Sequence, residues 1–525
     1  MSLLTVEQLS YTFADTKVLK RVEMQLTKYH HAALVGPNGT GKSTLLSLLG
    51  GHRLPDEGRI LWLPGTKIGY LTQQLDIDPE ASVRDVLLTA FAELYALEHE
   101  MLELADKIAV AAAKEPTSGS GQGWDAYTRR FAETQELLLS LGFYDIDTTV
   151  AKVADGLGLA ALGLETPVSM LSGGQRTKVA LAKLLLQQPD VLLLDEPTNY
   201  LDTMHVDWLA GYLNEYPHAF IVVSHDTAFL NRIANVVFHL LNQELTRYPG
   251  NYDAFLKAFE LRKNQAQTLY QQQQEEIRKL ETYIQKNKVR ASTATQAKSR
   301  EKRLAKTLAE RIDPPKSAPH PRFRFHYLES PTAVVAATKD LLIGYGNPLF
   351  GSLDLKVKRG AKVAVTGFNG IGKTTLLRTL LGEVPALSGS VVLGDGVRVG
   401  YFEQEARKVG EETPLESIWM AYPKLTHKEV RQALAACAVR GEKVLQPSTT
   451  LSGGEQAKVR LCHLMLSGAN WLVLDEPTNH LDAEAKGALR EALMTFDGTI
   501  VLVTHESEFY RDWITDIWDV SRWRR

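Results

Sequence analysis

Two hydrophobic patterns alternate along most of the 525-residue chain. Short, uninterrupted apolar runs such as Ala32–Val35 and Phe220–Val223 end at Gly or Ser, which is typical of strands buried on both faces of a parallel sheet. Amphipathic segments with helical spacing follow these runs, for example after Ser43. The same order returns in the second half of the chain, so the pattern predicts an α/β fold that is present in two copies.

A third pattern lies between the copies. No Gly or Pro interrupts the chain from Asp253 to Ile312, and good helix formers dominate it. A narrow apolar stripe recurs at helical spacing, formed by Leu269, Ile277, Leu280, Ile284, Ala297, Leu304 and Leu308. The helix formers give way to small and hydroxylated residues between Val289 and Thr295. We therefore predict two helices folded back on each other at this tip, the first about 35 residues and roughly 50 Å long.

The segment between the copies is strongly basic, although the whole chain has a formal net charge of −3. From Lys286 to Arg311 it holds nine Lys or Arg against two Glu. The simplest interpretation is a solvated helix pair, but length, tip and charge together favour contact with nucleic-acid phosphates. The residues expected to make this contact are Lys286, Lys288, Arg290, Lys298, Arg300, Lys302 and Arg303.

Length and composition limit the class of protein. With 525 residues, 44% of them apolar, the chain is long enough for three or four domains with large cores. The first residues lack the segments of a signal peptide, and no apolar run reaches the ~20 residues that cross a bilayer. The two cysteines, Cys437 and Cys462, show no metal-binding spacing and are expected to be buried thiols. We expect a cytoplasmic protein.

A phosphate-binding loop follows the first buried strand. Gly36–Ser43 reads GPNGTGKS, which matches G-x-x-x-x-G-K-[ST], and it leads directly into a helix. In such a loop the glycines turn backbone amides toward phosphate oxygens, the lysine reaches the β- and γ-phosphates, and the hydroxyl ligates Mg²⁺. The expected nucleotide-binding residues of this copy are Gly36, Asn38, Gly39, Gly41, Lys42, Ser43 and Thr44.

Further motifs follow in the first copy. LSGGQ begins at Leu171, and Ser172 is expected to cap a helix whose amides at Gly173, Gly174 and Gln175 form a second phosphate-facing surface. The strand VLLLDEP then places Asp195, expected to hold the Mg²⁺ shell, beside Glu196, expected to polarise the attacking water. The next strand ends near His225, which this motif order would bring to the γ-phosphate.

The second half of the chain repeats every motif. Its expected nucleotide-binding residues are Gly367, Asn369, Gly370, Gly372, Lys373, Thr374 and Thr375, with Ser452, Gly453, Gly454 and Glu455 in the second signature. Thr374 and Asp475 are the matching Mg²⁺ ligands, and Glu476 and His505 the matching catalytic residues. The second signature reads LSGGE, and Thr-His-Glu replaces Ser-His-Asp.

These motifs in this order resemble the ATP-binding cassette (ABC) superfamily, and LSGGQ distinguishes that superfamily from other P-loop ATPases. The resemblance implies that Phe13 and Tyr345 stack on adenine and that Gln73 and Gln404 are the Q-loop glutamines near the metal. It also implies ATP and Mg²⁺ as cofactors and switch roles for both histidines. ABC cassettes pair the phosphate loop of one with the signature of the other, so we expect a monomer with an intramolecular cassette dimer that hydrolyses ATP at both sites.

The spacing between the copies changes once. Gly36 and Gly367 are 331 residues apart, whereas Leu171 and Leu451 are 280 apart. The first copy therefore carries 51 additional residues, which fall in about 82–142. They are interpreted as two amphipathic helices, Val83–Lys114 and Trp124–Leu141, joined by PTSGSGQG. We expect a projecting helical hairpin; the sequence leaves open whether it binds a partner or thickens the helical subdomain.

Two cassettes joined by a long basic helical linker resemble the ABC-F subfamily, and NKVRASTATQAKSREKRLAK is similar to its linker motif. The resulting division is a first nucleotide-binding domain at 1–250, a linker at 251–331 and a second nucleotide-binding domain at 332–525. Bacterial members bind the ribosomal exit site when loaded with ATP and direct the linker toward the P-site tRNA and the peptidyl-transferase centre. The resemblance therefore implies a ribosome partner through 23S rRNA and P-site tRNA, with release on hydrolysis.

Other functions stay open at this stage. Members that relieve antibiotic blockage tend to carry an extended linker tip, and the short tip here favours a general translation factor acting on stalled or initiating ribosomes. Antibiotic protection of the ribosome is the alternative within the family. An ATPase subunit of a membrane transporter and a nucleic-acid repair ATPase are the alternatives of another class.

Overall fold

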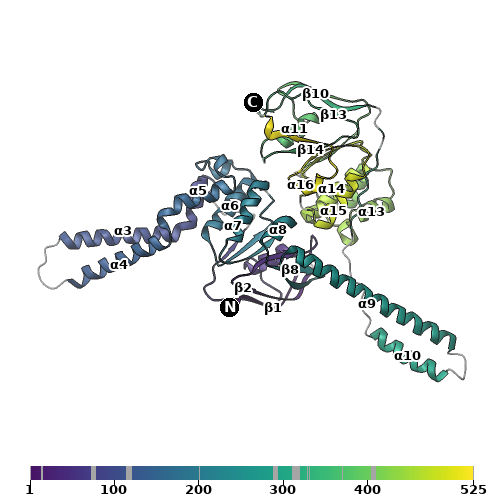
Figure 1. Cartoon of the computed structure of the whole chain (residues 1–525), viewed down its shortest axis with the longest axis horizontal. Coiled ribbons are helices and arrows are strands. Elements are labelled where there is room, and N and C mark those ends of the chain that lie inside the picture. The colour runs from purple at the N-terminus through teal and green to yellow at the C-terminus, as the bar shows by residue number, and fades with distance from the viewer. Residues whose placement is uncertain are drawn as a thin grey trace.

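The structure is a computed structural model, which describes residues 2–13, 16–71, 78–113, 121–199, 201–287, 294–309, 320–327, 329, 332–368, 370–403, 410–479 and 481–523. Figure 1 shows two α/β bodies side by side and two helical hairpins that project from them in different directions. The predicted fold class, two tandem cassettes joined by a long helical hairpin, is confirmed.

A mostly parallel sheet forms the centre of the first cassette. Its strand order is β5-β6-β7-β3-β8-β9, with only β9 antiparallel to its neighbour. The bounds are β3 His31–Val35, β5 Ile68–Tyr70, β6 Val191–Asp195, β7 Ala219–Val223, β8 Val236–Leu241 and β9 Glu244–Pro249. Strands β6 and β7 are almost completely buried, which explains their continuous apolar sequence. A separate antiparallel sheet holds β1 Ser2–Phe13, β2 Thr16–Thr27 and β4 Glu57–Trp62.

Helices cover both faces of this sheet. Their bounds are α1 Lys42–Leu49, α2 Val83–Leu88, α5 Ile146–Gly156, α6 Gly173–Gln187, α7 Thr203–Asn214 and α8 Thr227–Ile233. One hydrophobic core lies between the sheet and α6, and another lies between the sheet, α1 and the antiparallel strands. The phosphate loop and the signature therefore start helices that are anchored in two different cores.

The inserted segment forms a hairpin of α3 Ala92–Ala113 and α4 Gly121–Ser140. The predicted continuous helix from Val83 to Lys114 is wrong, because a 3₁₀ turn at Thr89–Phe91 separates α2 from α3. The Thr89 hydroxyl donates to the Val86 carbonyl (2.6 Å), and Phe91 packs on the α6 core at this turn. The second helix starts at Gly121, earlier than predicted.

The linker is an antiparallel pair of α9 Tyr252–Asn287 and α10 Ala294–Ala309, as predicted from the apolar stripe. With 36 residues, α9 is roughly 54 Å long. Ile277, Leu280 and Ile284 are buried where α10 packs against α9. The base of α9 is held by aromatic contacts, in which Phe255 and Phe259 meet the ring of His239 edge-on. The hairpin is thus attached to the first cassette beside β8.

The second cassette repeats the first. Its parallel sheet has the order β16-β17-β18-β14-β19, with β14 Lys362–Thr366, β16 Val399–Phe402, β17 Trp471–Asp475, β18 Thr499–Val503 and β19 Asp516–Asp519. Smaller sheets hold β10 Val334–Leu342, β13 Lys356–Lys358 and β15 Ser388–Leu393, and β11 Gly344–Tyr345 with β12 Asn347–Pro348. The helices are α11 Lys373–Leu380, α12 Pro414–Ala421, α13 His427–Ala436, α14 Gly453–Leu466, α15 Ala483–Met494 and α16 Ser507–Tyr510.

Candidate ATP sites

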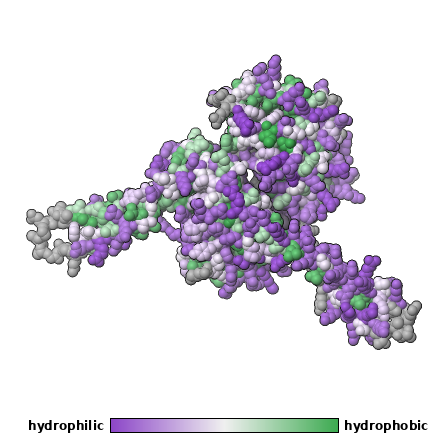
Figure 2. Space-filling view, in the orientation of Figure 1, coloured by the Kyte–Doolittle hydropathy of each residue, from purple (hydrophilic) through white to green (hydrophobic). Residues whose placement is uncertain are grey.

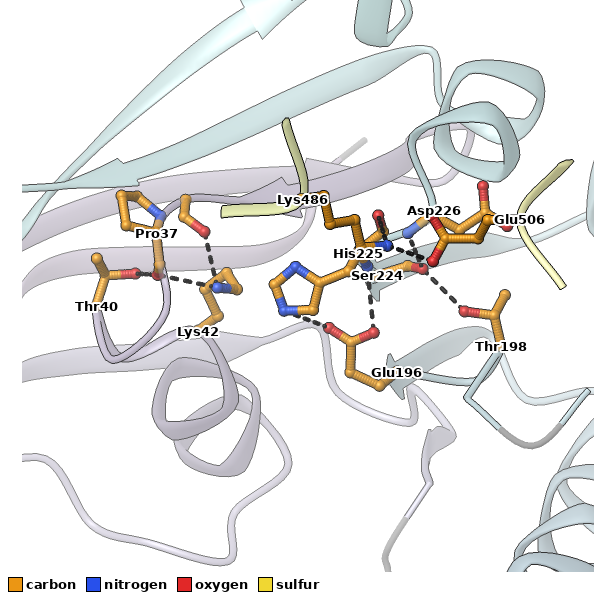
Figure 3. A network of polar contacts seen from close by, with 11 residues as sticks. Pro37, Thr40, Lys42, Glu196, Thr198, Ser224, His225, Asp226, Lys486 and Glu506 are labelled. Carbon is orange, nitrogen blue, oxygen red and sulfur yellow. Dashed lines mark hydrogen bonds and ion pairs between the residues drawn. The ribbon is translucent and has the colours of Figure 1, made fainter. Parts of the chain in front are cut away.

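The first phosphate loop connects β3 to α1 and requires glycine at specific positions. Gly36, Gly39 and Gly41 have positive φ angles. A Cβ added at Gly36 would lie 2.3 Å from the Leu240 carbonyl oxygen, and one at Gly41 would lie 2.2 Å from Val18 Cγ1. The Lys42 ammonium donates to the carbonyls of Gly36 (2.8 Å) and Pro37 (3.0 Å), so it lies inside the loop (Figure 3). Glycine is therefore required at Gly36 and Gly41, as the phosphate-loop motif predicts.

The second phosphate loop has the same geometry. Gly367, Gly370 and Gly372 again have positive φ angles. Lys373 Nζ donates to the Gly367 carbonyl (2.6 Å) and lies 2.9 Å from His505 Nε2. Burial lowers the pKa of Lys42 and of Lys373, while the neighbouring carboxylates oppose that shift.

A hydroxyl and a carboxylate meet beside each loop. Thr374 Oγ1 donates to Asp475 Oδ2 (2.7 Å), and the Ser43 side chain is hydrogen-bonded to Asp195. The other carboxylate oxygen of each pair, Asp195 Oδ1 and Asp475 Oδ1, is buried with no hydrogen-bond partner among the described residues. Burial raises the pKa of both aspartates. A buried carboxylate oxygen next to a hydroxyl fits the oxygen ligands that Mg²⁺ prefers.

The register of the central strands sets the position of each glutamate. Asp195 on β6 pairs with Val223 on β7, so Glu196 lies level with the end of β7 and its amide donates to the Val223 carbonyl (2.9 Å). Glu196 has a φ of 49°, a strained value for a non-glycine residue. Its Oε1 is 3.2 Å from His225 Nε2 (Figure 3). Burial and then Asp195 raise the pKa of Glu196 to about 7.

The second cassette repeats this glutamate–histidine pair. Glu476 has a φ of 48°, and its Oε1 is 3.1 Å from His505 Nε2. Burial raises the pKa of Glu476 as well, and it lowers the pKa of His505 to about 4. The two glutamate–histidine pairs therefore have similar geometry, at the carboxyl ends of equivalent strands.

Each signature starts a helix through a capping box. Ser172 Oγ accepts from the Gln175 amide (3.3 Å), while Gln175 Oε1 accepts from the Ser172 amide (2.8 Å). Ser452 and Glu455 make the same reciprocal bonds at the start of α14. The predicted capping role of Ser172 is confirmed, and the fifth residue of each motif, Gln175 or Glu455, is held in a fixed position.

The structure brings the first phosphate loop and the second signature together. Both line one cavity of about 540 Å³, with Asn38 and Lys42 from the first cassette and Lys443, Glu455 and Asp482 from the second. We call this arrangement, Gly36–Ser43 with Ser452–Glu455, the first composite site. It has the head-to-tail form expected of an intramolecular cassette dimer.

The second composite site that the sequence predicts combines Gly367–Thr374 with Ser172–Gln175. Among the described residues, no atom lies within 4 Å of a Cβ added at Gly370 or at Gly173. Asp202 of the first cassette nevertheless acts electrostatically on Lys373 and His505 of the second. Asp202 therefore lies near Lys373 and His505, but the phosphate loop of the second site is more open than that of the first.

A central cavity of about 370 Å³ lies between the two glutamate–histidine pairs, and its lining includes Glu196, His225, Glu476 and His505. Lys486 on α15 crosses this junction. Its ammonium donates to Glu506 Oε1 (2.8 Å) and reaches the His225 carbonyl of the other cassette (3.4 Å) (Figure 3).

Comparison with known proteins agrees with this geometry. The sequence model of the ABC transporter family matches residues 19–199 and 350–479, and a second model described as ABC transporter matches 238–325. The uncharacterized ABC transporter ATP-binding protein YfmM of Bacillus subtilis is 45% identical over 100% of this chain and 99% of its own length. The ABC transporter F family member 5 of Arabidopsis thaliana is 31% identical over 98% of this chain and 74% of its own length.

The chain belongs to the ABC-F family.

As an ABC-F protein it binds and hydrolyses ATP. Its tandem fold also matches a solved structure titled a model of ribosome-bound archaeal Pelota and ABCE1. The TM-score is 0.58 at 19% identity, over 96% of this chain and 74% of that one, which shows the common fold. None of the helices described here has the length and apolar character that a membrane span requires.

Two arginines of the linker that the sequence predicts to contact RNA, Arg300 and Arg303, instead contact side chains of the facing helix α9. Arg303 pairs with Glu276 (2.6 Å), and the Arg300 guanidinium lies 3.6 Å from the centre of the Tyr283 ring. Lys286, Lys298 and Lys302 are exposed. In Figure 2 the α9–α10 hairpin is almost wholly hydrophilic, whereas hydrophobic residues follow part of the α3–α4 hairpin.

Some predicted residues lie outside the described part of the chain: Gln73, Lys288, Arg290, Asn369, Gln404 and the side chain of Phe13. Tyr345 is described and is 68% exposed, so its ring is accessible for stacking. Thr44 and Thr375 lie in the first turns of α1 and α11. The roles of these and the other site residues stay predictions.

Sequence reasoning missed Lys443 and Lys486, which both reach across the cassette junction. Comparison of the two copies could have found them, because the first copy has the uncharged residues Gly163 and Val206 at the positions equivalent to Lys443 and Lys486.

Proposed function

We propose that this ABC-F protein is an ATP-gated ribosome-binding factor. ATP with Mg²⁺ closes the two cassettes, and the closed form binds the exit-site region of the ribosome. The linker hairpin then points toward the P-site tRNA and the peptidyl-transferase centre and contacts 23S rRNA. Hydrolysis releases the protein, which acts as a translation factor on stalled or initiating ribosomes in the cytoplasm.

The observation that carries this proposal is the α9–α10 hairpin between two ATP-driven cassettes. The hairpin is too long for a simple connection, and it projects away from both cassettes (Figure 1). Exposed Lys286, Lys298 and Lys302 give it a cationic surface suited to RNA phosphates. The ribosome-bound ABC protein with the same fold supports a ribosomal partner.

Residue roles follow from the site geometry. Ser43 with Asp195, and Thr374 with Asp475, would hold Mg²⁺, with Gln73 and Gln404 as expected further ligands. The metal would neutralise charge on the phosphates. Glu196 and Glu476 would each orient the attacking water, and the histidines would hold those glutamates in place through the pairs at 3.2 and 3.1 Å.

Trapping the ATP-bound state tests the proposal. Changing Glu196 and Glu476 together to Gln should leave ATP bound without cleavage, so the protein should cosediment with 70S ribosomes only when ATP is present. Wild-type protein with ADP is the control. If the trapped variant stays in the supernatant with ATP, the ribosomal function is wrong.

The hairpin can be tested separately from the cassettes. Reversing Lys286, Lys298 and Lys302 to Glu should weaken ribosome binding of the trapped variant and reduce its salt dependence, because log affinity falls with log salt at roughly −0.7 to −0.9 per phosphate contact. The matched control reverses Lys17, Lys20 and Lys28, which the structure exposes on the first cassette. ATP turnover measured without ribosomes should survive both triple changes. Loss of turnover in the hairpin variant would instead indicate a structural scaffold.

A further inference from the structure

A lysine of the second cassette lies at the phosphate loop of the first. A Cβ added at Gly39 would lie 3.4 Å from Glu455 Oε1 and 3.5 Å from Lys443 Nζ. Lys443 and Glu455 form an ion pair, and both line the cavity that contains Asn38 and Lys42. Lys443 belongs to the 3₁₀ turn Gly441–Val444, upstream of the signature, and its side chain is 47% exposed. The Lys443 ammonium therefore lies close to the loop Gly36–Ser43 and is partly exposed to solvent.

The carboxylate partner of Lys443 cannot easily move away. Glu455 Oε2 accepts from the Ser452 amide (3.0 Å), which fixes the side chain in the capping box of α14. Burial acts to raise the pKa of Glu455, but Lys443 and Ser452 outweigh it and hold that pKa below its usual range. A negative charge is thus fixed beside a loop whose amides attract phosphates, and it would repel a polyphosphate unless a cation accompanied it.

The repeat shows that the lysine and the carboxylate occur together. At an offset of 280, Glu455 corresponds to Gln175 and Lys443 corresponds to Gly163. Glutamine and glutamate both complete a capping box, as the two signatures show, so helix capping does not explain the lysine. The charged pair is a property of the first composite site.

We propose that Lys443 is a phosphate ligand supplied in trans to the first composite site. With a nucleotide in Gly36–Ser43, its ammonium contacts the phosphate chain while it also neutralises Glu455. The phosphates thereby attract the second cassette to the first, through a residue outside the phosphate-loop and signature motifs. The inference rests on the proposed assignment of the first composite site to ATP.

The affinity for nucleotide, measured at one composite site at a time, tests whether Lys443 binds phosphate. In a Lys373→Ala background, binding of a fluorescent non-hydrolysable ATP analogue reports the first composite site. Lys443→Met should weaken that binding about tenfold, as expected for one partly exposed charge-assisted contact. Lys443→Arg should retain most of the affinity. The same Met substitution in a Lys42→Ala background reports the second site and should leave its affinity unchanged.

A second background separates phosphate binding from simple neutralisation. With Glu455→Gln already present, Lys443→Met should still weaken binding at the first site. If the loss disappears in that background, Lys443 only neutralises Glu455 and the proposal is wrong. Equal losses at both sites, or none at either, would also overturn it. If Lys373→Ala protein with Lys443 intact binds no analogue, the assignment of the first composite site itself fails, and the role of Lys443 fails with it.

Discussion

The two composite ATP sites share their catalytic parts and differ in what the opposite cassette contributes. Both have a glutamate–histidine pair at similar distance, 3.2 Å in the first cassette and 3.1 Å in the second. At the first site, Glu455 and Lys443 lie against Gly39. At the second, no atom among the described residues lies within 4 Å of a Cβ at Gly370, and Gln175 is the signature residue.

The asymmetry between the two sites therefore arises across the cassette junction. Within each cassette, strand register alone places the glutamate beside the histidine, and that register is the same in both sheets. The contacts made in trans depend on single positions outside the motifs, such as Lys443 and Lys486. We therefore expect substitutions at Lys443 or Lys486 to affect one site more than the other.

The largest expected effect concerns the catalytic glutamates. Glu196→Gln should reduce ATP turnover at the first site by on the order of 10²–10³-fold. Glu476→Gln should reduce turnover at the second site by a similar factor. Because the second signature already faces the first phosphate loop, we expect Glu196→Gln to remove more than half of total phosphate release and Glu476→Gln less than half. Glu215→Gln, at an exposed position, is the control. Equal losses from the two single variants would show equivalent sites.

A smaller effect is expected at the cassette junction. In a Glu476→Gln background, Lys486→Met should lower kcat at the first site several-fold with little change in KM, because Lys486 positions the His225 loop from the other cassette. Lys486→Arg should restore part of kcat. Arg490→Met, which removes an exposed ion pair on the same helix, is the matched control. A change in KM alone would argue against a positioning role.

The motifs predicted the fold and the elements that carry the candidate site residues, because phosphate loops, signatures and the Asp-Glu pair need fixed residues at fixed spacing. The break at Thr89–Phe91 could not be predicted, since the segment VLLTAFAELY contains only residues that a helix tolerates and the turn is set by packing on α6. The contacts of Arg300 and Arg303 within the hairpin could not be predicted either, because they depend on tertiary packing. Their partners Tyr283 and Glu276 lie on the other helix, and a charge count cannot distinguish a pairing arginine from a free lysine.

A further effect is expected on stability without nucleotide. The pKa of Glu196 is raised to about 7 by burial and Asp195, against the opposing Lys42 and Lys486, so the folded protein binds the proton more tightly than the unfolded chain. The free energy of unfolding of the wild-type protein should therefore fall as pH rises from about 4.5 to about 7. Glu196→Gln has no carboxyl group to ionise at this position, so it should not show this loss. The gain in free energy of unfolding should be on the order of 1–3 kcal/mol at pH 8 and close to zero below pH 4.5.

The same measurement separates the two glutamates. Glu476 is more deeply buried, with 7% of its side chain exposed against 18% for Glu196, so Glu476→Gln should raise the thermal midpoint more. Thermal unfolding at pH 5 and pH 8 measures both variants. A pH-independent gain would mean that buried charge is not its cause.

Imaging the Glu196→Gln/Glu476→Gln protein with ATP on 70S ribosomes would show whether ATP closes the cassettes and brings the hairpin to ribosomal RNA. We predict nucleotide in both composite sites, the second signature closed over Gly36–Ser43, and the α9–α10 hairpin against RNA with Lys298 and Lys302 at phosphates. ATP-loaded particles with separated cassettes, or with the hairpin in solvent away from RNA, would contradict it.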